Sequence, residues 1–395
     1  MSESQVGERS AGRIDAIDWL RGAVMVLMAL DHVREFFWFG LVNPQNPATA
    51  SPALFFTRWI THFCAPTFVL LAGAGAYLYG ARGRARSALA WFLLSRGVWL
   101  VLLEFTIVRW SSLFNFDYRF TFGQVIWAIG GSMVLLSGLV WLPTGVIGVI
   151  GAAIIATHNL LDGVSAEQVG APEWLWTLLF RQKSIVIAPG YVYFNVYPLW
   201  AWFGVLCAGY GLGPILQLDR GRRRLILLGL GVALTAAFVA LRALHLYGDP
   251  RPWTVQKDSL RTVMAFLACT KYPPSLQFLL MTLGPALIVL AAVDRRSGPP
   301  FKPLITYGRV PLFYYLLHFP LIHGLAVAWA WQRYGRTDWL FANPGLFSPR
   351  PPFDGGMSLP GVYLVWILVV VALYWPCKWF AGVKRRHPGG WLSYL

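Results

Sequence analysis

The chain contains repeated apolar segments long enough to span a lipid bilayer, and this pattern constrains its fold more than any other feature. Hydrophobic residues make up 57% of its 395 residues, and only 13% are charged. A soluble domain of this composition would expose too much apolar surface. We predict membrane spans at residues 17–38, 54–79, 88–108, 121–141, 143–158, 191–213, 224–245, 274–293, 308–330 and 359–380. The sequence thus predicts an all-α polytopic membrane protein, a single domain (1–395) of about ten transmembrane helices.

Basic residues indicate how this bundle is oriented. An even number of spans places both termini on one side, and clusters of Lys and Arg follow on that same side: Arg9, Arg13, Arg82, Arg84, Arg86, Arg96, Arg220, Arg222, Arg223, Arg224, Arg295, Arg296, Lys302, Arg309, Lys378, Lys384, Arg385 and Arg386. Basic loops face the cytoplasm, so we expect cytoplasmic termini, including a tail of residues 1–15. The net charge of +16 follows from this asymmetry and requires no nucleic-acid partner.

The start of the chain predicts a retained first span and not a cleaved signal peptide. Asp15 and Asp18 precede the first apolar run, and no small-residue cleavage site follows it. The four cysteines, Cys64, Cys207, Cys269 and Cys377, lie in apolar surroundings without a Cys-x-x-Cys spacing. We therefore predict no metal site and no disulfide framework, and treat the cysteines as small core residues.

Two of the connections that we place outside the cytoplasm are long. Residues 246–273 contain an amphipathic pattern, which fits either a helix lying flat at the membrane interface or a roof over a substrate cleft. Residues 331–358 form a loop rich in turn-forming residues.

The first span carries two ionisable side chains on one face, Arg21 near its start and His32 near its end. Eleven helical steps turn the chain by about 1100° and advance it by about 16 Å, so the two side chains are aligned. Ionisable groups inside a membrane are costly and point to function. An imidazole whose pKa lies near neutrality is a natural general base.

Other polar residues are expected around His32. Glu35 lies three residues further on and can orient the imidazole, whereas Asp31 can pair with Arg34. Further candidates lie in the second span, where Arg58 and His62 share a face, and in the ninth, which holds His318. For His318 an alternative remains, because Pro320 frees a backbone carbonyl that a nearby polar side chain could satisfy.

Arg21 is our candidate anchor for the phosphates of a coenzyme, although Asp18 could instead form a simple surface pair with it. The separation between Arg21 and His32 is comparable to an extended pantetheine arm. Met28 would line part of that path. These residues therefore predict a site for an acyl-CoA whose acyl carbon lies near His32.

The motif Asp18-Trp-Leu-Arg-Gly with Arg21-x10-His32 resembles the first helix of the transmembrane acyltransferase superfamily. The whole chain resembles bacterial relatives of heparan-alpha-glucosaminide N-acetyltransferase, and three segments carry that resemblance: residues 58–73, 271–284 and 308–320. The resemblance implies a bundle of about ten or eleven helices in a bacterial inner membrane. It also implies transfer of an acyl group from cytoplasmic acyl-CoA to a hydroxyl or amine of an extracytoplasmic sugar or glycan, and acetyl-CoA is our preferred donor. The lysosomal enzyme of that family has its catalytic histidine in the luminal segment after the first helix, and residues 39–53 here contain none.

Our hypothesis assigns catalysis to His32, Glu35, Asp31, His62 and His318, and coenzyme binding to Arg21, Arg58 and Met28, with no metal. The sequence leaves open whether the protein forms a homodimer.

Two other functions remain open. A proton- or anion-coupled transporter would use Asp31, His32, Arg58, Glu104 and His318, but predicts two related halves, which we do not find. A non-catalytic membrane scaffold would use its buried polar groups to specify helix packing.

Overall fold

A computed structural model describes residues 14–40, 42–294, 301–345, 348–352 and 354–387. Residues 1–13 of the predicted cytoplasmic tail lie outside the described residues, as do Arg295 and Arg296 and residues 346–347 and 353 of the loop 331–358.

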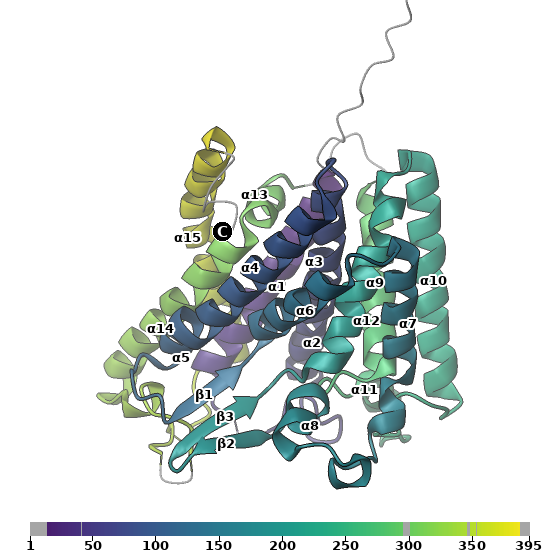
Figure 1. Ribbon diagram of the computed structural model, residues 1–395. Coiled ribbons are helices and arrows are strands. Elements are labelled where there is room, and N and C mark those ends of the chain that lie inside the picture. The colour runs from purple at the N-terminus through teal and green to yellow at the C-terminus, as the bar shows by residue number, and fades with distance from the viewer. Residues whose placement is uncertain (1–13, 41, 295–300, 346–347, 353, 388–395) are drawn as a thin grey trace, which may run out of the picture.

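Most of the described chain is helical, and the helices run side by side through the molecule (Figure 1). The first half contains α1 (Asp15–Phe37), α2 (Pro52–Ile60), η1 (Thr61–Phe63), α3 (Cys64–Gly80), α4 (Arg86–Leu103), the π-helix η2 (Glu104–Val108), α5 (Arg109–Leu113), α6 (Val125–Leu139), α7 (Thr144–Thr157), η3 (His158–Leu161), η4 (Glu167–Val169) and α8 (Glu173–Phe180). The second half contains α9 (Leu199–Gln217), α10 (Arg220–Ala243), α11 (Ser259–Leu267), α12 (Leu276–Val293), α13 (Pro303–Arg309), α14 (Pro311–Tyr334), η5 (Asp338–Leu340) and α15 (Leu359–Arg386).

Among the described residues, eight helical segments are long and apolar enough to cross a membrane: Pro52–Gly80, Arg86–Leu113, Thr144–Leu161, Leu199–Gln217, Arg220–Ala243, Leu276–Val293, Pro311–Tyr334 and Leu359–Arg386. Two further helices match predicted spans. α6 is apolar but has only 15 residues, and α1 has 23 residues but carries six charged side chains. The polytopic helical fold is therefore confirmed, whereas the number of spans stays a prediction.

The helices form an inner and an outer group. The most apolar 18-residue window of α12 is 78% buried, whereas the corresponding window of α15 is only 17% buried. Large apolar side chains of α15 face outward, including Leu364, Leu368 and Trp375. Such a surface is suited to contact with lipid acyl chains. The four cysteines are buried and free, as expected for core residues.

Local capping explains where several helices begin. Ser51 accepts a hydrogen bond from the Leu54 N–H at the start of α2, and Ser275 accepts one from the Phe278 N–H at the start of α12. Asp219 and Asp258 cap α10 and α11 in the same way. These side chains satisfy backbone donors that the first helical turn leaves unpaired.

A small three-stranded sheet closes the end of the bundle opposite the start of α1 (Figure 1). It consists of β1 (Phe120–Gly123), β2 (Ser184–Ala188) and β3 (Tyr191–Asn195) in the order β1-β3-β2, with β1 parallel and β2 antiparallel to β3. Our prediction that the sixth span begins at residue 191 was wrong, because this segment forms β3 and α9 begins at Leu199. The fourth span likewise begins later than predicted, at Val125. Short apolar and aromatic runs fit a strand as well as a helix.

The segment 246–273 contains the short amphipathic helix α11. Met264 is buried beside Phe55 of α2, while Leu260 and Val263 remain exposed. Arg261 donates hydrogen bonds to the carbonyl oxygens of Pro47 and Ala48. The segment therefore packs against the chain that leads into α2.

Helix α1 crosses α13 at a pair of glycines, Gly22 and Gly308. A Cβ atom on Gly22 would overlap the carbonyl oxygen of Leu304, and one on Gly308 would overlap that of Asp18. Only a residue without a side chain allows the two backbones to approach this closely.

We expect Gly308→Ala to lower the melting temperature of the purified protein in detergent, because the added methyl group forces α1 and α13 apart. Overpacking of this kind costs about 1–3 kcal/mol. Gly324→Ala in α14 is the matched control, since its Cβ would meet no described atom within 4 Å. Equal melting temperatures for the two variants would contradict the close crossing.

Candidate functional site

The second half of α1 places four candidate residues on one helix face. Met28, Asp31, His32 and Glu35 follow the spacing i, i+3, i+4 and i+7, which aligns side chains along one side of a helix. They line a cavity of about 120 Å³. Its other walls come from η1, α3, the start of α6 and two loops, through Thr61, Cys64, Ala65, Phe68, Gln124, Val125, Val196, Tyr197, Lys271 and Tyr272.

Asp31 is held between two arginines. Its carboxylate accepts a hydrogen bond from Arg34 at 3.1 Å, as predicted from their spacing, and a second from Arg58 of α2. All three residues are buried. The Arg58 guanidinium is therefore already paired, and this pair connects α1 to α2.

His32 and Glu35 contact each other as their spacing predicts. Nδ1 of His32 lies 3.3 Å from Oε2 of Glu35. An ionised carboxylate only accepts, so Nδ1–H donates to Glu35, and in the neutral form of the ring Nε2 then carries the lone pair. Within the described part of the chain Nε2 makes no hydrogen bond, which leaves it able to accept a proton from a bound group.

His318 of α14 lies beside His32, with 5.2 Å between the ring centroids. Its Nδ1–H donates to the carbonyl oxygen of Tyr315 at 2.6 Å, and its Nε2 is buried without a partner among the described residues. The side chain of His318 therefore does bond a backbone carbonyl, as the structural alternative for this residue supposed. The acceptor is the carbonyl of Tyr315, however, and not the one that Pro320 frees. His318 does not line the cavity itself.

His62 lies in a different environment from His32. Its Nε2 accepts a hydrogen bond from the amide of Gln45 at 2.8 Å, and it lines a separate small pocket of about 20 Å³ together with Arg58. The structure therefore does not bring His62 into the cavity of His32.

Arg21 lies about two helical turns from Met28, toward the start of α1. Its guanidinium is 3.3 Å from both the Asp18 carboxylate and the carbonyl oxygen of Gly308. The contact with Asp18 that the spacing allowed is therefore present. Arg309 of α13 also approaches Asp18, at 3.9 Å.

The sequence reasoning did not assign Lys271 and Tyr272 to the site. Both precede α12 and are separated from His32 by more than two hundred residues, yet they line the same cavity. The sequence signals were a lysine followed by Tyr-Pro-Pro at the edge of an apolar span, and the position of both residues in the segment 271–284 that carries the family resemblance. Gln124 and Tyr197 were missed as well, because the segments that carry them were assigned to spans or their edges.

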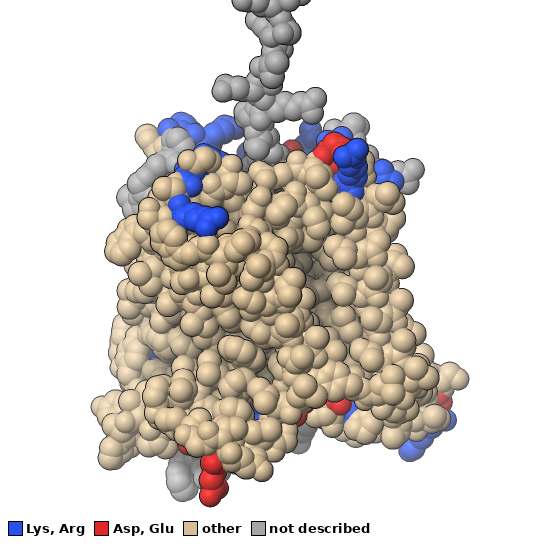
Figure 2. Space-filling model, turned by 45° about the vertical axis from the view of Figure 1, so that its right-hand side comes forward, with Lys and Arg blue, Asp and Glu red and all other residues tan. Residues whose placement is uncertain are grey.

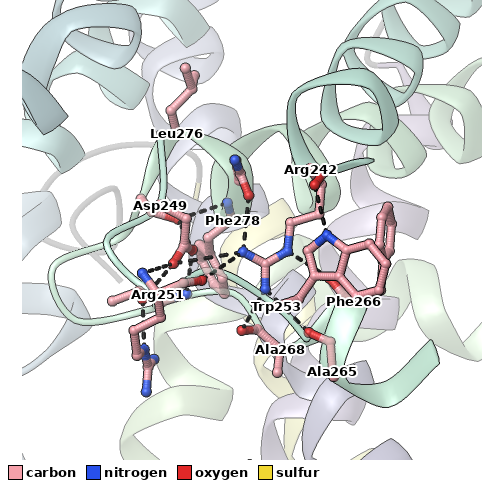
Figure 3. Close-up of polar contacts among 12 residues, drawn as sticks. Arg242, Asp249, Arg251, Trp253, Ala265, Phe266, Ala268, Leu276 and Phe278 are labelled. Atoms are coloured by element: carbon pink, nitrogen blue, oxygen red, sulfur yellow. Dashed lines mark hydrogen bonds and ion pairs between the residues drawn. The ribbon is translucent and has the colours of Figure 1, made fainter. Parts of the chain in front are cut away.

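A dense polar network holds the loop that contains Lys271 (Figure 3). Asp249 accepts hydrogen bonds from the Thr270 N–H at 2.8 Å and from the Ser275 hydroxyl at 2.7 Å. Arg242 donates to the carbonyl oxygens of Phe266 and Ala268. The backbone on both sides of Lys271 is therefore fixed.

The described residues contain no group of three or more His, Cys, Asp or Glu side chains placed to hold a metal ion. The side chains that line the cavity supply an imidazole, two carboxylates, an ammonium group and tyrosine hydroxyls.

Comparison with known proteins identifies the family. No curated protein matches the chain. The family model described as heparan-alpha-glucosaminide N-acetyltransferase, catalytic, matches residues 13–247, more than half of the chain. The match contains α1 with Arg21, Asp31, His32 and Glu35, and it ends before Lys271. The chain therefore belongs to the heparan-alpha-glucosaminide N-acetyltransferase catalytic family.

Proposed function

We propose that the protein is a membrane acetyltransferase that moves an acetyl group from cytoplasmic acetyl-CoA to a hydroxyl or amine of a sugar on the opposite side of the membrane. The observation that carries this proposal is the cavity in which Glu35 orients His32. Family membership supports the reaction class.

The distribution of charge supports the proposed orientation. Figure 2 shows Lys and Arg side chains gathered at the end of the molecule where α1 begins, above a broad band of uncharged surface. Basic residues favour the cytoplasmic side. The sheet and the cavity near the end of α1 would then face the extracytoplasmic side, where the acceptor sugar is found.

In the proposed reaction, Arg21 binds the coenzyme phosphates at the cytoplasmic end of α1, and the pantetheine arm extends past Met28 to the cavity. Nε2 of His32 removes a proton from the acceptor while the acceptor attacks the thioester carbonyl carbon. Asp31, Arg34 and Arg58 fix α1 against α2, so that His32 is held at the cavity wall. His318 lies beside the His32 ring, and His62 has no assigned step.

Acetyl-CoA should raise the melting temperature of the purified protein, because a ligand that binds only the folded state stabilises it by about 2.7 kcal/mol at 100 times its Kd. Arg21→Ala should reduce this rise. Arg222→Ala is the control, since its side chain is 80% exposed at the start of α10. No rise with acetyl-CoA or with longer acyl-CoAs would contradict an acyltransferase and favour the transporter or scaffold.

His32→Ala should lower acetyl transfer by about 100- to 10,000-fold, the usual range for loss of a general base. Acetyl-CoA should still raise the melting temperature of this variant, because the phosphates bind elsewhere. Release of the CoA thiol in the presence of glucosamine measures the transfer. His387→Ala at the exposed end of α15 serves as the control. Wild-type transfer rates in His32→Ala would refute its role as the base.

A further inference from the structure

Lys271 is a buried cation that has no ion-pair partner among the described residues. The residue is 5% exposed and lines the cavity of His32. Its Nζ lies 5.1 Å from the centre of the Tyr272 ring. Among the described residues, no acceptor forms a hydrogen bond with it and no carboxylate lies within 4.0 Å of it. Because burial of an unpaired ammonium group is costly, this arrangement indicates a group that the cavity is built to receive.

The charges around the cavity do not balance, and the positive charge of Lys271 is the one in excess. Asp31 is shared between Arg34 and Arg58, and Glu35 contacts His32 and, at 3.5 Å, Arg34. Three cations therefore face two carboxylates, which leaves one positive charge to be balanced.

The pKa of Tyr272 responds to this excess of positive charge. Burial raises the pKa of its hydroxyl, but the positive charges of Lys271 and Arg58 outweigh this effect and leave the pKa below its usual value. The Tyr197 hydroxyl also hydrogen-bonds to Tyr272. The cavity thus favours a negative charge near Lys271.

The position of Lys271 is fixed before any substrate binds. Asp249 holds Thr270 and Ser275, and Arg242 lies 3.9 Å from Asp249 while it donates to Gln277 of α12 at 3.1 Å (Figure 3). From the other side, Nε2 of His158 lies 2.7 Å from the carbonyl oxygen of Pro274. Donors fixed in this way stabilise a developing charge without first having to reorganise.

We propose that Lys271 stabilises the oxyanion that forms during acetyl transfer. This inference rests on the proposed function. The acceptor forms a bond to the thioester carbonyl carbon as its proton moves to Nε2 of His32, and the carbonyl π electrons move onto the oxygen beside Nζ of Lys271. Collapse restores the carbonyl, breaks the C–S bond and releases the CoA thiolate, which takes the proton from the His32 imidazolium.

The placement of the two groups favours an oxyanion over a permanently bound anion. Lys271 and His32 line one cavity of about 120 Å³, in which an acetyl group would be flanked by both. A cation that meets its counter-charge only in the transition state accelerates the reaction, whereas one that binds an anionic acceptor equally in the ground state does not raise kcat.

The test compares Lys271→Met, which keeps the aliphatic stem, with Lys271→Arg, which keeps the charge. Transfer from acetyl-CoA to glucosamine should show kcat reduced by about 100- to 1,000-fold in Lys271→Met, as for other lost oxyanion donors, with partial recovery in Lys271→Arg. The KM values and the stabilisation by acetyl-CoA should change little. Lys183→Met is the control, a lysine whose side chain is 63% exposed near the sheet and pairs with Glu173. An unchanged kcat, or an effect confined to the KM of the acceptor, would overturn the proposal.

A second measurement does not depend on turnover. Acetate, a carboxylate of acetyl size, should raise the melting temperature of the wild-type protein more than neutral acetamide does, and Lys271→Met should abolish the difference. If acetate acts in this way but the wild type transfers no acetyl group, the proposed function and the oxyanion role fail while the anion site remains. If acetate and acetamide act alike, the anion site itself is refuted.

Discussion

The buried ion pairs of Asp31 are the contact on which the candidate site depends. A carboxylate beneath an apolar surface is tolerated only when it is paired, and Asp31 is paired with Arg34 on its own helix and with Arg58 on α2. Replacement of Asp31 by a neutral residue would leave the buried charge of Arg58 without its ion-pair partner, at a cost of about 3–5 kcal/mol. The same pairs fix the rotation of α1, because Asp31 directly precedes His32. These ion pairs therefore also set the orientation of His32 in the candidate site.

The helical framework could be predicted from the sequence because hydropathy depends on neighbouring residues alone. Each predicted span contains helical residues, and cap residues such as Ser275 and Asp219 mark helix starts. The sheet could not be predicted. Residues 191–195 read as the beginning of an apolar span, and only pairing with residues 120–123 and 184–188, far away in the chain, makes them a strand.

The candidate site, like the fold, could be predicted only in part from the sequence. Contacts along α1, such as His32 with Glu35 and Asp31 with Arg34, follow from helical spacing and were predicted. The closeness of His32 to His318, and of the cavity to Lys271, depends on how α14 and the loop before α12 pack against α1. No local pattern contains that information. His62 shows the converse error, since its helical spacing from Arg58 placed it near the site but its side chain faces Gln45.

Both ends of the proposed site lie on one helix, and this has a physical consequence. Gly22 and Gly308 bring α13 against α1 beside Arg21, whereas the Asp31 pairs hold the other end against α2. Between these two points α1 is a continuous helix, so the distance from Arg21 to His32 is set by its rise, about 16 Å. A coenzyme bound at Arg21 would then present its thioester at a fixed depth, next to a cavity of about 120 Å³.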